Sequence, residues 1–185
     1  MRVIAGTARG RALVAPRGSA TRPIADRVKE TLFAILGDRV PDARVLDLYA
    51  GSGAVGIEAL SRGAAHCDFV ERDRPAVAAI RENLERAAVT DRGSVHVEDV
   101  LRYLAVPGGD RFSLAILDPP YNERAILAPL ERLIGRLAPG AMVVVKHHWR
   151  TPIQLPQGLT AWRERRFGET TLTFLVAGRA DEEEP

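Results

Sequence analysis

One stretch decides the fold of this chain: Val45-Leu46-Asp47-Leu48-Tyr49-Ala50-Gly51-Ser52-Gly53-Ala54-Val55-Gly56. An apolar run over 44–49 leads into Gly51, Gly53 and Gly56, the spacing of a glycine loop between a β-strand and an α-helix. Glycines in such a loop let a ligand and a neighbouring strand approach the backbone closely. The spacing alone fits either a dinucleotide site or an adenosyl cofactor site.

Strand and helix patterns alternate outward from this loop. The expected strands are 44–49, 67–71, 94–98, 112–118, 141–147, 160–167 and 170–177, and the expected helices are 25–36, 54–62, 74–88, 100–105 and 123–137. Alternation with short connections predicts a parallel sheet covered by helices on both faces. The last two strands meet at Gly168-Glu169, which predicts an antiparallel hairpin. We therefore expect an α/β fold, Rossmann-like, with a mostly parallel seven-stranded sheet that ends in this hairpin.

Acids close the first three strands of this pattern: Asp47, Glu71 and Asp99. S-Adenosylmethionine carries no phosphates but has an ammonium and a sulfonium group, which a carboxylate beside the loop complements. An acid after the second strand can accept the ribose hydroxyls, and one after the third can accept the adenine amino group. A plainer interpretation is that each acid is a solvated strand end. We assign the cofactor S-adenosylmethionine (product S-adenosylhomocysteine) to Asp47, Gly51, Gly53, Glu71 and Asp99.

The fourth strand ends in Asp118-Pro119-Pro120-Tyr121. Two prolines stiffen the turn and remove two N–H donors, so the Asp118 carboxylate and the Pro119 carbonyl are left as acceptors. Two acceptors can hold the N–H bonds of an exocyclic amino group and turn its lone pair toward a methyl donor, while Tyr121 stacks on the base. The target base must be single-stranded or flipped out. The tetrapeptide therefore predicts methyl transfer to an amino nitrogen, with all four residues catalytic.

Composition narrows the class of protein. The 185 residues are 46% apolar, which suits one soluble domain. We expect a cytoplasmic monomer away from membranes, because no apolar run reaches the ~20 residues of a membrane span and no signal-peptide core precedes the first helix. One cysteine, Cys67, and four histidines without metal-binding spacing predict no metal site.

The N-terminal segment is basic and free of acids up to residue 22. Short apolar runs at 2–5 and 11–15 predict a β-hairpin, and its arginines suit phosphate contact. The substrate-contacting arginines are expected to be Arg2, Arg9, Arg11 and Arg22. We divide the chain into this hairpin and loop (1–22), the cofactor-binding domain (23–179) and a disordered acidic tail (180–185).

Several segments carry a family resemblance. They are Arg2-Val3-Ile4-Ala5-Gly6, Arg9-Gly10-Arg11, Thr21-Arg22-Pro23, Asp26-Arg27-Val28, 45–53, Glu58-Ala59-Leu60-Ser61-Arg62-Gly63-Ala64 and 118–121. With them the chain resembles the bacterial small-subunit ribosomal RNA guanine-N2 methyltransferases, the RsmD family, over nearly its whole length. The resemblance implies a class I methyltransferase fold, N2 methylation of guanine 966 in 16S rRNA, and a small ribosomal subunit or its assembly intermediate as partner.

Other functions compete with this interpretation. A DNA amino methyltransferase, acting on adenine N6 or cytosine N4, would carry a similar tetrapeptide, but a DNA site usually requires a further recognition module. A protein glutamine methyltransferase commonly has Asn where Asp118 stands. A ribosome assembly factor that only binds the cofactor would not need the intact tetrapeptide, and a nicotinamide dehydrogenase would need a hydride-transfer site that the sequence does not offer.

Overall fold

The computed structural model describes residues 1–16, 26–106, 111–119 and 124–178, and a seven-stranded sheet runs through it. The strand order is β3-β2-β1-β4-β5-β7-β6. The strands are β1 Arg44–Leu48, β2 His66–Val70, β3 Gly93–His96, β4 Phe112–Leu117, β5 Leu137–His148, β6 Leu159–Phe167 and β7 Thr170–Ala177. The five neighbouring strands β3, β2, β1, β4 and β5 are parallel, and β7 is antiparallel to both β5 and β6. This confirms the expected α/β sheet and its terminal hairpin.

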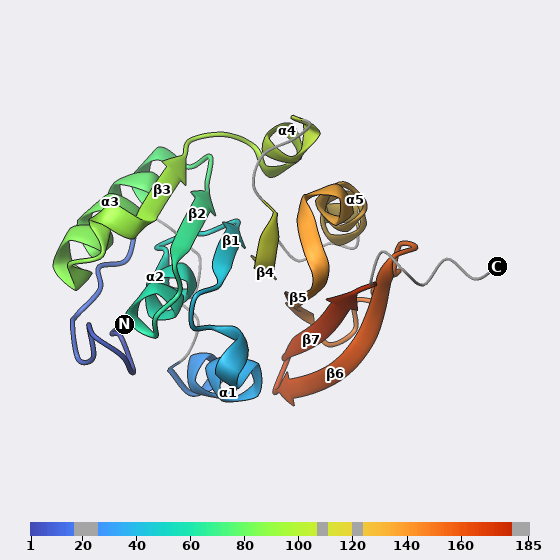
Figure 1. The fold of residues 1–185 in the computed structure, drawn as a ribbon, viewed down its shortest axis with the longest axis horizontal. Helices are drawn as coiled ribbons and strands as arrows, with labels where there is room; N and C mark the ends of the chain where they lie inside the picture. The colour runs from blue at the N-terminus through green and yellow to red at the C-terminus, as the bar shows by residue number, and fades with distance from the viewer. Residues whose placement is uncertain (17–25, 107–110, 120–123, 179–185) are drawn as a thin grey trace.

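Helices cover both faces of the sheet (Figure 1). They are α1 Asp26–Leu36, α2 Ala54–Ser61, α3 Arg74–Ala87, α4 Val100–Ala105 and α5 Arg124–Leu133, with 3-10 turns at Gly37–Arg39, Thr90–Arg92 and Ile134–Arg136. One hydrophobic core joins α1, α2 and α3 to the sheet, and a second joins α4 and α5 to its other face. In β4, Leu114 and Ile116 enter the first core and Ala115 and Leu117 the second, as alternation along a strand requires. Within the described ranges, no helix is long and apolar enough to cross a membrane.

Two element boundaries differ from the sequence expectation by more than two residues. Strand β5 begins at Leu137 rather than near residue 141, because Leu137 pairs with Phe112 before an irregularity in the β4–β5 register. Helix α5 ends at Leu133, and the chain tightens into a 3-10 turn through Ile134–Arg136. The 3-10 turn connects α5 directly to the extended β5, so the helix is shorter than its apolar pattern indicates.

The strand order reverses between β1 and β4, which lie side by side. From β1 the chain proceeds outward to β2 and β3, and then it crosses back to β4. Leu48 is paired with Leu117 at the ends of these two strands, and the Asp118 amide donates to the Leu48 carbonyl at 3.4 Å. Open α/β sheets bind ligands at such a reversal, outside the carboxyl ends of the strands. The fold thus places the glycine loop and Asp118 next to each other.

The N-terminal hairpin is much smaller than expected. Its two arms meet at an antiparallel bridge between Arg2 and Ala12 and are joined by further backbone hydrogen bonds, such as that from the Val3 amide to the Arg11 carbonyl, but they do not extend as strands over 2–5 and 11–15. The reason is that the amides of Ile4 and Ala5 donate to the Glu58 carboxylate of α2, not across the hairpin. The segment is therefore attached to the helical layer. The expected loop end (17–22) and the expected acidic tail (180–185) lie outside the described residues.

Candidate active site

The glycine loop runs from β1 into α2, and Asp47 holds the start of that helix. Gly53 has a φ of +72°, in the left-handed region that glycine adopts at little cost. Gly56 packs so tightly against β2 that an added Cβ would lie 2.3 Å from Phe69 Cε1. The Gly56 amide donates to Asp47 Oδ2 at 3.0 Å. The glycine spacing thus serves backbone conformation and helix packing, and a buried carboxylate sits under the helix N-terminus.

Glu71 connects the end of β2 to the glycine loop. Its Oε2 accepts from the Gly51 amide at 2.9 Å, and its Oε1 accepts from the amides of Arg72 and Asp73 at 2.8 and 2.9 Å. A carboxylate offers about four acceptor positions, so Oε2 retains room for a further donor such as a hydroxyl group. The expected contact between Glu71 and the ribose stays a prediction that this geometry permits.

Asp99 lies at the third strand end and caps a helix. Its Oδ1 accepts from the Leu101 amide at 2.9 Å at the start of α4, and its Oδ2 lies 3.4 Å from Arg72 Nη1. The side chain is 46% exposed, so it remains accessible at the edge. Its negative charge also contributes to raising the pKa of Tyr49 to about 12, after burial of the phenol as the larger cause. Asp99 therefore lies near the β1 end, as a cofactor-binding role would require.

Electrostatics show that the acids of this edge lie close together. Burial raises the pKa of Asp47 to about 8, its bond to Gly56 opposes that shift, and the charges of Asp118 and Glu71 raise it further. Three carboxyl groups thus interact around the ends of β1, β2 and β4. Such a group of carboxyls favours a cationic ligand, because the cation stabilises their ionised forms.

Asp118 follows β4 at the same edge, where it is bound by Lys146 of β5. Lys146 Nζ donates to both carboxylate oxygens of Asp118, at 2.8 and 2.6 Å. Although 36% of the Asp118 side chain is exposed, desolvation of the carboxylate by the surrounding protein raises its pKa. The charge and the hydrogen bonds of the Lys146 ammonium partly offset that rise. Pro119 is buried beside it, whereas Pro120 and Tyr121 lie outside the described residues.

Lys146 is one of several residues, with Asp26, His147 and His148, to which the sequence assigns no role. The sequence did contain a signal for Lys146: in a parallel sheet, a lysine near the end of the strand that follows the tetrapeptide lies at the same edge as the tetrapeptide. Identifying Asp118 as its partner required the register between β4 and β5. Its neighbour His147 is only 5% exposed, and Nε2 lies 2.9 Å from Thr173 Oγ1 inside the sheet. Lys146 therefore belongs to the candidate active site, whereas His147 belongs to the core.

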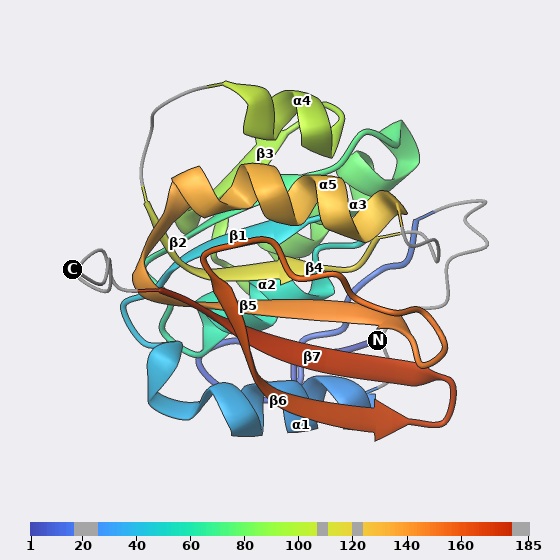
Figure 2. The ribbon, with the colours of Figure 1, turned by 90° about the vertical axis from the view of Figure 1, so that its right-hand side faces the viewer.

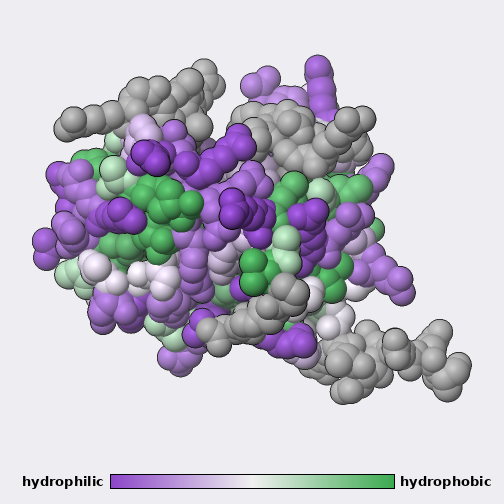
Figure 3. All heavy atoms as spheres, turned by 90° about the horizontal axis from the view of Figure 1, so that it is seen from above, coloured by the Kyte–Doolittle hydropathy of each residue, from purple (hydrophilic) through white to green (hydrophobic). Residues whose placement is uncertain are grey.

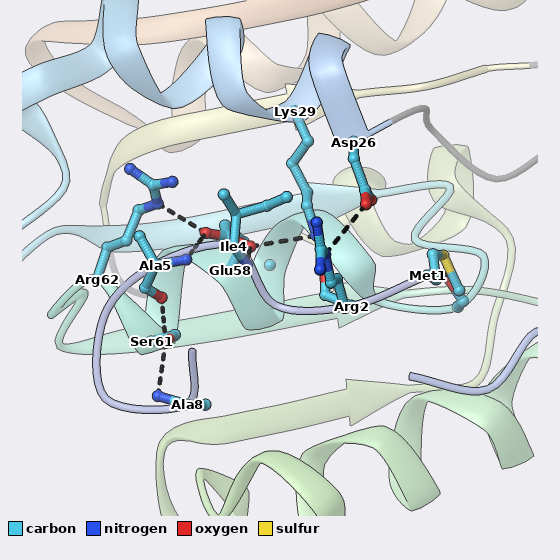
Figure 4. A network of polar contacts seen from close by, with 12 residues as sticks. Met1, Arg2, Ile4, Ala5, Ala8, Asp26, Lys29, Glu58, Ser61 and Arg62 are labelled. Carbon is cyan, nitrogen blue, oxygen red and sulfur yellow. Dashed lines mark hydrogen bonds and ion pairs between the residues drawn. The ribbon is translucent and has the colours of Figure 1, made fainter. Parts of the chain in front are cut away.

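Arg2 of the N-terminal segment lies beside a buried polar network (Figure 4). Arg2, Arg9 and Arg11 are exposed, as substrate contact requires, and Arg22 lies outside the described residues. Glu58 at the centre of this network is fully buried; besides the amides of Ile4 and Ala5 it binds Lys29 Nζ at 3.1 Å and Arg62 Nε at 2.8 Å. Lys29 also donates to the Arg2 carbonyl at 2.6 Å.

This segment also touches the glycine loop. Buried Asn83 of α3 exchanges hydrogen bonds with the Val14 backbone, at 2.7 and 3.0 Å, and donates to the Ser52 carbonyl at 2.9 Å. Asp26, whose role the sequence did not assign, lies 3.5 Å from Arg2 Nε. The candidate substrate-contacting segment and the candidate cofactor loop therefore share one rigid support.

The face of the molecule seen in Figure 3 is mixed in character. Hydrophilic side chains cover most of this face, and hydrophobic ones gather in separate patches.

Cys67 is buried, and burial raises its pKa well above the ordinary thiol value, so it is an unreactive core residue. Within the described part of the chain, no group of three or more His, Cys, Asp or Glu side chains is placed to hold a metal ion.

Known proteins resemble the chain over almost its whole length. Residues 1–176 match the family described as "Conserved hypothetical protein 95". "Ribosomal RNA small subunit methyltransferase D" of Escherichia coli is 35% identical over 91% of this chain and 86% of that protein. The Haemophilus influenzae protein of the same name is 34% identical over 91% and 89%. The solved structure of Escherichia coli yhhF superposes with a TM-score of 0.87 at 30% identity, covering 96% of this chain and 98% of that one.

Proposed function

Because this chain belongs to the family described as Conserved hypothetical protein 95, the RsmD family of rRNA methyltransferases, we propose that it methylates N2 of guanine 966 in 16S rRNA. Membership of this family shows that the chain is an rRNA methyltransferase that depends on S-adenosylmethionine. We propose in addition the modified base, the modified atom and the small subunit as the substrate.

The residues at the sheet edge fit the cofactor. S-Adenosylmethionine brings a cationic sulfonium, which supplies the methyl group, together with an ammonium group. Asp47 lies under the glycine loop with its pKa raised by burial and by two neighbouring carboxylates, so a cation at this place relieves an existing repulsion. Glu71 keeps one acceptor position beside Gly51, and Asp99 is exposed at the next strand end.

One observation carries the proposed reaction: Asp118 lies at the carboxyl edge beside the glycine loop, held by two bonds from Lys146. In the proposed reaction the carboxylate and the Pro119 carbonyl accept the two N–H bonds of the guanine amino group, which aligns its lone pair for in-line attack. The same acceptors stabilise the positive charge that develops on nitrogen. Lys146 holds the carboxylate in place and counteracts its tendency to protonate.

The substrate side agrees with structured RNA. The exposed arginines of residues 1–16 suit phosphates without base reading. Specificity then has to come from the shape of a folded RNA or ribonucleoprotein. The names of the relatives also favour rRNA over the DNA amino methyltransferase alternative.

The test is transfer of labelled methyl groups to small subunits lacking this methylation, to naked rRNA and to duplex DNA in parallel, followed by mapping of the product. We expect the small subunit to be the best acceptor and the label to lie on N2 of guanine 966. Asp118→Ala should abolish transfer while cofactor binding persists. Faster transfer to DNA, or a different labelled atom, would overturn the proposal.

A further inference from the structure

Three exposed side chains gather where β5 and β6 end, away from the N-terminal segment. The Arg166 Cζ lies 3.9 Å from the centroid of the Trp149 ring, and the Arg150 Cζ lies 4.7 Å from it. Trp149 is 38% exposed, and both arginines are exposed. At these distances the indole π electrons attract each guanidinium. One tryptophan thus organises two cations at the surface; Trp149, Arg150 and Arg166 are here called the Trp149 cluster.

The Trp149 cluster lies at the same edge of the sheet as the catalytic carboxylate. Strands β5 and β6 are both antiparallel to β7, so they run in the same direction and end on the same side (Figure 2). Trp149 follows Lys146 by three residues, or about 10 Å of extended chain, and Lys146 binds Asp118. The Trp149 amide donates to the Glu169 carbonyl at 2.9 Å, which joins the end of β5 to the β6–β7 turn.

Hydrogen bonds hold the Arg166 side chain and the Arg150 backbone in place. Arg166 Nε donates to the Gly168 carbonyl at 2.8 Å, so its guanidinium is oriented before any ligand arrives. The Arg150 amide donates to His148 Nδ1 at 3.2 Å. A preset guanidinium loses little conformational freedom when it binds, and its planar fork matches the oxygens of a phosphate group. The acids of this hairpin, Glu164 and Glu169, leave the surrounding surface only moderately basic.

We propose that the Trp149 cluster binds phosphate groups of the rRNA substrate beside the reacting guanine. This inference rests on the proposed function. In the sheet order, β5, β7 and β6 lie on one side of β4, whereas β1, with α2 and the N-terminal segment, lies on the other. The RNA is then held on both sides of Asp118, by exposed arginines of the N-terminal segment and by the Trp149 cluster.

The experiment measures binding of the full-length protein to small ribosomal subunits as a function of salt concentration. Each lost phosphate contact lowers the slope of log affinity against log salt by about one. The double variant Arg150→Ala/Arg166→Ala should therefore lower it by about two, raise the KM for small subunits and leave kcat and the cofactor Kd unchanged. Lysine at both positions should restore most of the slope.

The matched control is Arg163→Ala. Arg163 lies on β6, as Arg166 does, and it also lies near a tryptophan: its Cζ is 6.0 Å from the centroid of the Trp162 ring. It is paired with Phe174, whose side chain belongs to the core on the α1 face, so Arg163 is directed to the opposite face from the Trp149 cluster. We expect this variant to bind with the wild-type slope.

The outcomes separate this inference from the proposed function. If the wild-type protein neither binds nor methylates small subunits, both fail. If the wild type does both and the Arg150/Arg166 variant keeps the wild-type slope and KM, the Trp149 cluster does not contact RNA. An equal loss in Arg163→Ala would overturn the assignment to this face. Thermal unfolding of each variant, expected at the wild-type temperature, shows that the change is confined to the surface.

Discussion

At the scale of single residues, the ion pair between Lys146 and Asp118 affects the protonation of the proposed catalytic carboxylate. Burial raises the Asp118 pKa and the Lys146 ammonium lowers it, so removing the ammonium should raise the pKa further. We expect Lys146→Met to move the acidic limb of the pH profile of kcat to higher pH, because a protonated Asp118 accepts fewer N–H bonds. Lys146→Arg should retain the wild-type limb. Single-turnover rates measure both, and an unshifted limb in Lys146→Met would contradict this role.

Asp47 should couple cofactor binding to proton release. Its folded pKa of about 8 exceeds its ordinary value, so the carboxyl stabilises the fold at low pH, and that contribution is lost as pH rises through about 8. A bound cation favours the ionised form. Cofactor affinity should therefore increase with pH up to about 8, with a proton released at neutral pH. Calorimetry in two buffers of different ionisation enthalpy measures the proton, and Asp47→Asn, which keeps an acceptor for Gly56, should release none.

At the scale of elements, the N-terminal segment, α1 and α2 are joined through one carboxylate. Glu58 has no exposed surface and binds Lys29, Arg62 and two backbone amides. Glu58→Gln leaves Lys29 buried without its counter-charge, a change that costs about 3–5 kcal/mol of unfolding free energy. Urea unfolding measures it. Combining it with Lys29→Met removes both charges and should cost less than the single change.

Glu82→Gln supplies a matched control for this prediction. Glu82 and Arg86 form a pair with the same four-residue spacing on a helix, 2.7 Å apart, but their side chains are 50% and 46% exposed. An exposed pair contributes about 0–1 kcal/mol, so this variant should unfold near the wild-type midpoint. Equal losses in Glu58→Gln and Glu82→Gln would show that burial of the network contributes nothing.

The elements of the sheet could be predicted from sequence because their patterns are local. Alternating apolar runs and the Gly51–Gly56 spacing placed β1, α2 and β4 within a residue or two. The short extent of the N-terminal hairpin could not be predicted, because the competing acceptor for its amides, Glu58, is 53 and 54 residues away in the chain. The Lys146–Asp118 ion pair could not be predicted either, because it depends on the register between β4 and β5, which neither strand's own sequence specifies.

At the scale of the whole molecule, residues 1–16 pack against the hydrophobic core and also form a candidate surface for substrate contact. Val3, Ala8 and Leu13 are 1%, 3% and 6% exposed and belong to the core of α1, α2 and α3. An added Cβ on Gly6 would lie 1.8 Å from the Ser61 carbonyl oxygen, so the segment lies directly on α2. Deleting it would remove part of the core together with its arginines. Its role in binding has to be tested by surface substitutions that leave Val3, Ala8 and Leu13 in place.

Such substitutions allow the two-sided arrangement around Asp118 to be tested as a whole. Arg9→Ala/Arg11→Ala removes two exposed cations on the β1 side of β4, and Arg150→Ala/Arg166→Ala removes two on the β5 side. Because the two pairs lie on opposite sides of β4, the strand that ends at Asp118, their effects should add. The quadruple variant should lose about four from the salt slope of small-subunit binding, about two from each pair. A quadruple variant with no more loss than one pair alone would mean that RNA contacts only one side of Asp118.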